Sequence, residues 1–233
     1  MLGVTKKLIA EFIGTAVLVF MGCGTAMLVG CDAASGSGYL ITALAFGLSI
    51  VAMAYSIGNI SGCHINPAVS LAMLIRGSID LSEYAGYVIA QVLGGFFGSC
   101  VLAVIFGLGG VDDLTGGFGA NSLAGVHGSA AAGLLVEIVL TFIFVMAILG
   151  VTSEKFKHGS FGGLIIGLTL TFVHILGIGL TGTSVNPARS LAPAIFAAAK
   201  GNAAPIASLW VFIIAPLIGA ALAAVVYGFL EKE

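Results

Sequence analysis

Charged residues are scarce in this chain. Only 8% of its 233 residues are Asp, Glu, Lys or Arg, whereas 59% are hydrophobic. A soluble domain carries about a quarter charged residues, so this chain is unable to cover itself with a polar surface. The scarcity of charge excludes a soluble globular protein and indicates an integral membrane protein in a lipid bilayer. The net charge of −2 gives no basis for a nucleic-acid partner.

Cysteine is also sparse, and its spacing excludes two kinds of site. No pair of cysteines has the Cys-x-x-Cys spacing, and each cysteine lies in or beside an apolar segment. Such cysteines are expected to be free thiols rather than disulfide partners or zinc ligands. The sequence contains neither a nucleophile–base pair nor a cluster of metal ligands, so we expect no enzymatic activity, no metal and no cofactor. The four cysteines are Cys23, Cys31, Cys63 and Cys100.

Six hydrophobic runs are long enough to cross a bilayer, whose core of about 30 Å requires about 20 helical residues. The first run resembles a lipoprotein signal that ends at Cys31. It is too long for such a signal and contains Glu11, so a transmembrane helix is the better interpretation. The predicted spans are 8–30, 39–58, 83–107, 131–151, 160–178 and 207–229.

The triplet Asn-Pro-Ala occurs twice, 120 residues apart (186 − 66). Each triplet opens an apolar run, 66–75 or 186–198, that is too short to cross a bilayer, since ten to thirteen helical residues span about 15–20 Å. Asn is a favoured N-cap, and Pro is favoured at the next position. Each run is therefore predicted to be a re-entrant half-helix whose positive end lies near the membrane midplane. The triplets are Asn66, Pro67, Ala68 and Asn186, Pro187, Ala188.

The two halves of the chain are repeats, approximately 1–107 and 131–233, within a single transmembrane domain of residues 1–233. The segments around the two triplets align with each other, and Gly47 aligns with Gly167 at the same offset of 120. Each half contains three spans, an odd number, so the second half must be inverted relative to the first. The predicted fold is an all-α integral membrane protein with six transmembrane helices, two re-entrant half-helices and inverted three-helix repeats.

The basic residues indicate the orientation. With the N-terminus inside the cell, six of them fall on the cytoplasmic side and only Lys200 falls clearly outside, which is a strong positive-inside pattern. Both termini are therefore expected in the cytoplasm, in a protein of the plasma (inner) membrane. The stretch 108–130 becomes a long external loop, in which Asp112 and Asp113 are expected to form a solvated turn. The six residues are Lys6, Lys7, Arg76, Lys155, Lys157 and Lys232.

Three charged residues lie at membrane depth. Arg189 follows the second triplet directly, and an intramembrane cation is usually functional. Its repeat counterpart is Val69, so a path through the membrane between the two half-helices would carry this charge at only one mouth. Glu11 and Glu137 occupy equivalent places in the two halves. We interpret them as structural carboxylates that accept hydrogen bonds from the re-entrant loops, although a pump would use such groups as proton relays.

The loops before the half-helices are predicted to line a narrow wet path, because unwound backbone at membrane depth must line a cavity or be buried in protein. Their carbonyl groups are predicted acceptors that lead to the amide donors of Asn66 and Asn186. His174 aligns with Ala54, so a pore-facing role and an ordinary hydrogen-bonded core histidine both remain open. The lining positions in the loops are Gly62, Cys63, His64, Ile65, Gly182, Ser184 and Val185.

With these residues, the chain resembles the aquaporin family, the major intrinsic proteins. The duplicated Asn-Pro-Ala, the segment around Glu11, Glu137 and the run from Ser184 to Ser190 all match, and the similarity covers nearly the whole chain. The resemblance implies a homotetramer with one pore per subunit. It also implies a narrow filter near the external mouth, formed by Phe46, His174, Thr183 and Arg189.

The resemblance favours the water-selective branch of the family. Glycerol-conducting members usually have Gly at the position of His174, Trp at that of Phe46 and Asp at that of Ser190. Some members are blocked by mercurials at the position of Thr183, whose repeat counterpart is Cys63. We therefore hypothesise that Cys63 faces the pore on the cytoplasmic side and confers mercurial block.

The predicted function is passive, bidirectional conduction of water in single file, with exclusion of protons and other ions. The main alternative is a channel for glycerol or another small neutral solute. A secondary transporter would require an ion-binding carboxylate on the path, for which Glu11 and Glu137 are the candidates. A structural membrane protein with an incidental pore is a further alternative.

Overall fold

A computed structural model describes residues 2–31, 37–153, 155 and 159–232 of the chain. These residues form eight α-helices and two short 3₁₀ helices, without a strand. The α-helices are α1 (Leu2–Val29), α2 (Ser37–Ser61), α3 (Pro67–Ile75), α4 (Leu81–Gly109), α5 (Ala130–Thr152), α6 (Gly162–Thr181), α7 (Pro187–Ala199) and α8 (Ala204–Leu230); the 3₁₀ helices are η1 (Ala124–Val126) and η2 (Gly159–Phe161).

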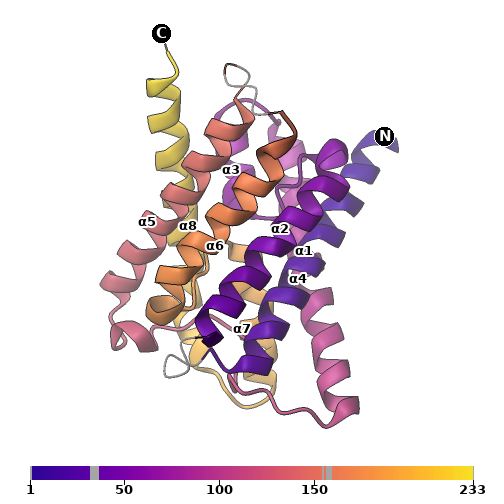
Figure 1. The fold of residues 1–233 in the computed structure, drawn as a ribbon, viewed down its shortest axis with the longest axis vertical. Helices are drawn as coiled ribbons and strands as arrows, with labels where there is room; N and C mark the ends of the chain where they lie inside the picture. Colours follow the sequence, from indigo (N-terminus) through magenta and orange to yellow (C-terminus); the bar gives the residue numbers. More distant parts are fainter. Residues whose placement is uncertain (1, 32–36, 154, 156–158, 233) are drawn as a thin grey trace.

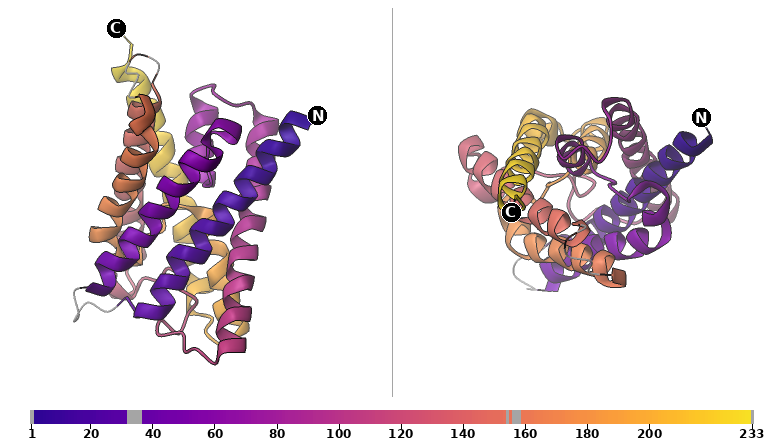
Figure 2. Two further views of the ribbon diagram at one scale, coloured as in Figure 1. Left: turned by 45° about the vertical axis from the view of Figure 1, so that its right-hand side comes forward. Right: turned by 90° about the horizontal axis from the view of Figure 1, so that it is seen from above.

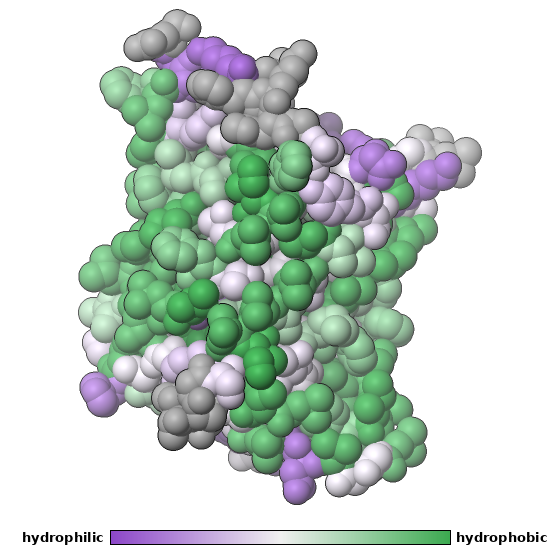
Figure 3. Space-filling model, in the orientation of Figure 1, coloured by the Kyte–Doolittle hydropathy of each residue, from purple (hydrophilic) through white to green (hydrophobic). Residues whose placement is uncertain are grey.

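Six of these helices are long and apolar enough to cross a membrane: α1, α2, α4, α5, α6 and α8. Their bounds agree with the predicted spans to within three residues, except that α1 begins at Leu2 rather than at residue 8. Lysine is a good helix former, so the helix continues through Lys6 and Lys7 although the hydrophobic run has not yet begun. Figure 3 shows the result as a broad apolar band with hydrophilic residues gathered at its two ends.

Both termini lie at the same end of the bundle (Figures 1 and 2). We call this end the termini end and the other the opposite end. The order of the helices places the described basic residues Lys6, Lys7, Arg76, Lys155 and Lys232 at the termini end and Lys200 at the opposite end. Lys157, which belongs to the predicted positive cluster, lies outside the described residues.

The packing repeats between the two halves. In the first half α1 packs on α4, and in the second half α5 packs on α8, while α2 and α6 pair with each other across the halves. Each half-helix also packs against a long helix of the other half: α3 against α8, and α7 against α4. Figure 1 shows α3 at the termini end and α7 at the opposite end. The fold is thus the predicted all-α membrane fold with two inverted three-helix repeats.

Close helix approach at glycine holds these pairs together. A Cβ built on Gly47 of α2 would lie 2.5 Å from the carbonyl oxygen of Gly167 on α6, and the reverse distance is also 2.5 Å. A Cβ on Gly94 of α4 would lie 2.2 Å from the carbonyl oxygen of Phe12 on α1. Such distances leave no room for a side chain, so small residues are required where the backbones meet.

Candidate functional site

The two half-helices begin at Asn66 and Asn186, whose side chains brace each other's loops. The Oδ1 atom of Asn66 accepts from the backbone N–H of Ala68 at 2.8 Å, and that of Asn186 accepts from Ala188 at 3.0 Å. Each Asn is therefore the N-cap of its half-helix. The Nδ2 atom of Asn66 donates to the carbonyl oxygen of Val185 at 2.7 Å, and that of Asn186 donates to Ile65 at 2.9 Å.

These reciprocal hydrogen bonds refine the predicted role of the two amides. An Asn amide has two N–H donors, and in each case the opposite loop takes one of them. A single N–H of each Asn is left for a permeating molecule, and its direction is fixed by the other. Because α3 and α7 meet here at their N-termini, the site also lies at the positive ends of two helix dipoles.

The loops before the half-helices have an unusual backbone. The φ angle is 53° at Cys63 and 41° at Ile65, and in the second loop it is 47° at Thr183 and 45° at Val185. Positive φ is a genuine outlier for a β-branched residue, and each such residue costs on the order of 1–3 kcal/mol. Strain at equivalent positions of both halves requires strong contacts that hold each loop in place.

Glu11 supplies those contacts for the first loop. Its carboxylate accepts from the backbone N–H groups of His64 at 2.9 Å and Ile65 at 2.6 Å. It also accepts from the Ser61 hydroxyl at 2.7 Å and from Nε2 of Gln91 at 2.7 Å. The side chain is fully buried, and all four partners are donors. A carboxylate used in this way has the geometry of a loop anchor.

Glu137 has the same arrangement in the second loop. It accepts from the backbone N–H groups of Ser184 and Val185, each at 2.8 Å, and from the Thr181 hydroxyl at 2.6 Å. This side chain is also fully buried. Both glutamates thus lie where a structural role requires them, since a buried charge is tolerated only when it is paired or hydrogen-bonded.

The carbonyl groups of the two loops differ in their hydrogen-bond partners. Within the described part of the chain, no protein donor reaches the carbonyl oxygens of residues 62–64 or 182–184, whereas those of Ile65 and Val185 accept from the two asparagines. A backbone carbonyl at this depth needs a hydrogen-bond partner. A continuous row of such carbonyl groups can accept hydrogen bonds from water.

The four predicted filter residues come together on the side of the asparagines that faces the opposite end. The rings of Phe46 and His174 are stacked with centroids 4.6 Å apart, and the Arg189 guanidinium carbon lies 4.7 Å from the centroid of Phe46. All are almost completely buried. Thr183 lies nearby, because a Cβ built on Gly177, three residues after His174 on α6, would lie 2.4 Å from its hydroxyl.

Three polar atoms in this layer lack a protein partner among the described residues: His174 Nε2, Thr183 Oγ1 and Arg189 Nε. His174 Nδ1 lies 2.9 Å from the carbonyl oxygen of Leu170, which can only accept, so Nδ1 carries the proton and Nε2 of the neutral ring is an acceptor. Buried polar atoms are nearly always hydrogen-bonded. One acceptor, one hydroxyl and one cationic donor are therefore available to a small polar molecule. This arrangement favours a pore-facing His174 over an ordinary core histidine.

The segment between α4 and α5 differs from the predicted external loop, because part of it folds inward. Residues 117–119 and Asn121 are buried, and the carbonyl oxygen of Gly119 accepts from Arg189 Nη1 at 3.0 Å. Asp113 is a turn residue whose carboxylate accepts from Thr115 and Phe118. The loop therefore positions the filter arginine, which hydropathy alone could not indicate.

Sequence reasoning missed the polar residues that support the half-helices. Ser190 donates to Asn121 at 2.8 Å, and Asn121 donates to the carbonyl oxygen of Thr181 at 3.2 Å. In the first half, Ser70 accepts from Gln91 at 3.0 Å. Ser70 and Ser190 are separated by the repeat offset of 120 residues (190 − 70), and Gln91 is an isolated amide in an apolar span. The repeated serine and the isolated amide were the features of the sequence that could have identified these residues.

A cavity of about 240 Å³ leads to the filter from the opposite end. Arg189 forms part of its wall, together with Thr42, Ile178 and Gly182. None of the described residues form a cluster of His, Cys, Asp or Glu that could hold a metal ion. The site therefore consists of a wide vestibule, a narrow polar layer and a central pair of amides.

Comparisons with known proteins agree with this geometry. The family model described as major intrinsic protein matches residues 2–227. Proteins named aquaporin Z are similar over 98% of this chain: that of Brucella melitensis is 44% identical, with 99% of its length covered, and that of Rhodopseudomonas palustris is 42% identical, with 95% covered.

A solved structure has the same fold. The X-ray structure of the aquaglyceroporin from Plasmodium falciparum superposes with a TM-score of 0.86 at 25% sequence identity, covering 96% of this chain and 95% of that one. The family match extends over nearly the whole sequence, including both half-helices and both buried glutamates. This chain belongs to the major intrinsic protein family, a family of membrane channels.

Proposed function

We propose that this protein is a passive channel that conducts water in single file across a lipid bilayer. The observation that carries the proposal is the central pair of asparagines, each with one N–H bound to the opposite loop and one left over. On either side of this pair lies a row of carbonyl acceptors without protein donors. Water can exchange hydrogen bonds along such a row without a chemical step or a coupled ion.

Cations are excluded by charge. The N-termini of α3 and α7 point their dipoles at the centre of the path, and the Arg189 guanidinium lies in the narrow layer. Both oppose the entry of a cation, including hydronium. The two asparagine donors also orient a central water with its oxygen toward them, which interrupts a continuous chain of proton transfer.

Water is favoured over glycerol by the residues of the narrow layer. Phe46 and His174 occupy positions where the resemblance implies Trp and Gly in glycerol-conducting relatives. The two rings are stacked 4.6 Å apart with Arg189 against Phe46, and this close packing supports an opening too small for glycerol. The similarity to aquaporin Z proteins supports this choice, and the similarity to an aquaglyceroporin is compatible with the alternative without favouring it.

A secondary transporter is disfavoured by the state of the two glutamates. Glu11 and Glu137 are fully buried, and the donors around them use their carboxylate oxygens to hold the loops. Neither carboxylate is exposed to the path as an ion-coupling site would need to be. No enzymatic role is part of the proposal.

The channel also has a domain organisation, an orientation in the membrane and an assembly. Residues 1–233 form a single channel domain, with repeats at approximately 1–107 and 131–233. The termini end faces the cytoplasm of a cell whose plasma (inner) membrane holds the protein, because the described basic residues gather there. The family resemblance supports a homotetramer with one pore in each subunit.

The test is osmotic permeability of the purified protein in proteoliposomes, measured by stopped-flow light scattering with water and with glycerol. We expect fast water flux and slow glycerol flux. Arg189→Val should admit glycerol or cations faster, because it removes the charge from the narrow layer. Lys200→Val is the matched control, since it removes a positive charge from the other end of the same half-helix, α7. Rapid glycerol uptake by the unaltered protein would overturn the choice of water.

A further inference from the structure

A second polar cavity, of about 400 Å³, lies at the termini end, away from the filter. It is enclosed by the C-terminal ends of three helices, α3, α5 and α8. The function proposed above uses none of its side chains. Its wall is formed by Met73, Arg76, Ser78, Leu149, Thr152, Ser153, Lys155, Tyr227 and Glu231.

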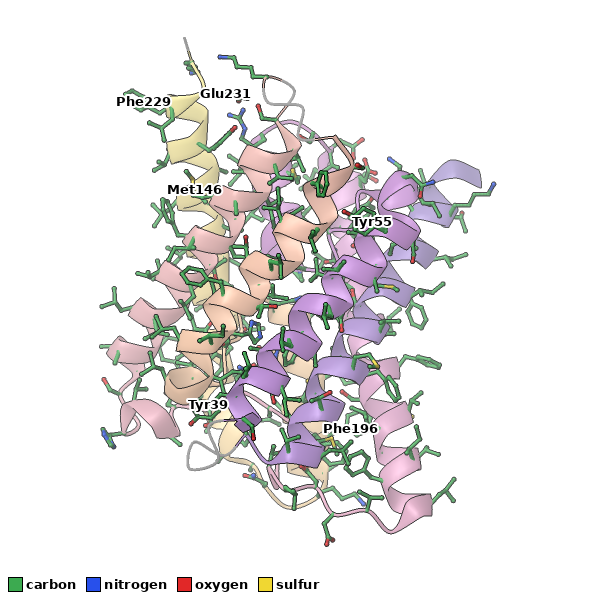
Figure 4. The ribbon with its side chains drawn as sticks, in the orientation of Figure 1. Tyr39, Tyr55, Met146, Phe196, Phe229 and Glu231 are labelled. Carbon is green, nitrogen blue, oxygen red and sulfur yellow. The ribbon has the colours of Figure 1, made fainter. Side chains whose placement is uncertain are left out.

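Glu231 fills part of this cavity with a carboxylate held by donors from separate elements. The Arg76 guanidinium, at the end of α3, binds one carboxylate oxygen, and the Ser153 hydroxyl, after α5, donates to the other at 2.8 Å. The Lys155 ammonium donates to the backbone carbonyl of the same residue. Figure 4 shows Glu231 beside the end of α8, which it follows directly. Arg76 and Ser153 therefore already bind an anionic group that belongs to the chain itself, and Lys155 binds the neutral backbone carbonyl beside it.

Close packing against α8 sets the position of the Arg76 guanidinium. A Cβ built on Gly228 of α8 would lie 2.5 Å from Arg76 Nη1, so a side chain there would displace the guanidinium. Arg76 also lies 5.8 Å from the centroid of the Tyr227 ring. Ser153 is buried, whereas the side chains of Arg76 and Glu231 are 27% and 21% exposed. The Arg76–Glu231 pair is therefore partly open to solvent, so an anion from solution can reach the donors that Glu231 occupies.

Phosphate is a second anion that this set of donors can bind. It has more acceptor oxygens, and guanidinium, ammonium and hydroxyl groups are its usual partners. The cavity has room for it, and Ser78 and Thr152 add hydroxyl groups to the wall. The site also lies at the right depth for a lipid headgroup, because the apolar spans α5 and α8 end at Thr152 and Leu230, directly beside it.

We propose that Arg76, Ser153 and Lys155 form a phosphate-binding site at the termini end, and that Glu231 is an internal competitor that occupies it. The ligand is a phosphate group, carried either by an anionic lipid headgroup or by a small soluble phosphate. Binding displaces the carboxylate and leaves the donors paired. Removal of the competitor therefore tightens binding, and removal of a donor weakens it.

The experiment compares four forms of the intact protein: the parent, Glu231→Gln, Ser153→Ala and Glu83→Gln. The last is a matched control, because Glu83 pairs with Lys7 at 2.6 Å at the same end of the bundle and its loss changes the net charge equally. The first arm titrates inorganic phosphate in detergent against chloride of equal ionic strength and follows the thermal transition. The second arm measures retention of phosphatidic acid, relative to phosphatidylcholine, by native mass spectrometry. Water permeability of each form verifies folding.

We expect saturable binding that is roughly three- to tenfold tighter in Glu231→Gln, since an occupied site lowers the apparent affinity by the fraction that is free. Ser153→Ala should weaken binding by roughly three- to tenfold, the effect of one lost hydrogen bond. A response to inorganic phosphate identifies a soluble ligand, and a response to phosphatidic acid alone identifies a lipid. Equal affinities in Glu231→Gln and Glu83→Gln, or no saturable response in either arm, would overturn the proposal.

Discussion

Replacing Gly22 with alanine should push the Phe46 ring into the pore. Gly22 lies on α1 directly behind this ring: a Cβ built there would be 2.2 Å from Cε1 and 2.4 Å from Cδ1. Carbon atoms in contact are about 3.5–4.0 Å apart, so the ring must move by roughly 1.3 Å. The same ring contacts His174 and Arg189, so its displacement should alter the layer that these three residues form.

A displacement of this size is large for a single-file pore, because it approaches half the diameter of a water molecule, about 2.8 Å. If each passing water must press the ring back against the new methyl group, an overpacking energy of about 1–3 kcal/mol enters the barrier. The permeation rate then falls roughly 5- to 150-fold, since 1.36 kcal/mol corresponds to a factor of ten. The alanine also improves helix propensity by about 1 kcal/mol, so the fold should remain stable.

Stopped-flow osmotic permeability, normalised to the protein content of the proteoliposomes, measures this effect. Gly58→Ala is the control, because Gly58 is also helical and no atom lies within 4 Å of a Cβ built there. Introducing Gly22→Ala into a Phe46→Leu background tests the cause, since the effect should disappear when the ring is absent. Parent-like permeability in a well-folded Gly22→Ala variant would refute the assignment of Phe46 to the constriction.

Two further predictions concern the loops. Glu137→Gln should lower the thermal transition in detergent by the equivalent of about 1.5–3 kcal/mol. The amide has a single oxygen, so it can accept from only one of the backbone N–H groups of Ser184 and Val185 in the present geometry, and its NH₂ group then faces the other N–H. An unchanged transition would contradict the anchoring role. Cys63→Ser should abolish mercurial inhibition of water flux. The control is Cys100→Ser, at an exposed position on α4, which should be inhibited like the parent protein. If Cys63→Ser is also inhibited like the parent, another thiol is responsible.

The elements of the fold were predictable because each is encoded locally. Hydrophobic run length indicates a membrane span without knowledge of its neighbours, and Asn followed by Pro identifies the start of a half-helix from adjacent residues alone. Among the predicted helices, the one clear error is the start of α1, at Leu2 instead of residue 8. Hydropathy reports where the hydrocarbon begins, whereas the helix continues through Lys6, which is exposed, and Lys7, which is partly buried.

The contacts that orient the site were not predictable in the same way. The hydrogen bond from Asn66 to Val185 joins residues 119 apart in the chain, and it exists only because α3 and α7 meet end to end. The contact of Arg189 with Gly119 depends on an inward fold of a segment without periodicity. Glu11 and Glu137 are intermediate cases: burial and duplication indicated their role, while the identity of their partners required the structure.

Duplication of the chain separates the positions that build the pore from those that select its permeant. Positions with a mechanical task are alike in both halves, such as Ser70 and Ser190, which are 120 residues apart. Positions in the narrow layer are not alike, because Arg189 corresponds to Val69 and His174 to Ala54. Backbone strain occurs in both loops and each loop has its own glutamate, so loss of either glutamate should weaken the loop that it holds. A charge in the path is needed only once, since a second cation at the other mouth would add desolvation cost at membrane depth without improving exclusion. The inverted repeat therefore constrains architecture, and selectivity is left free to differ between the two ends.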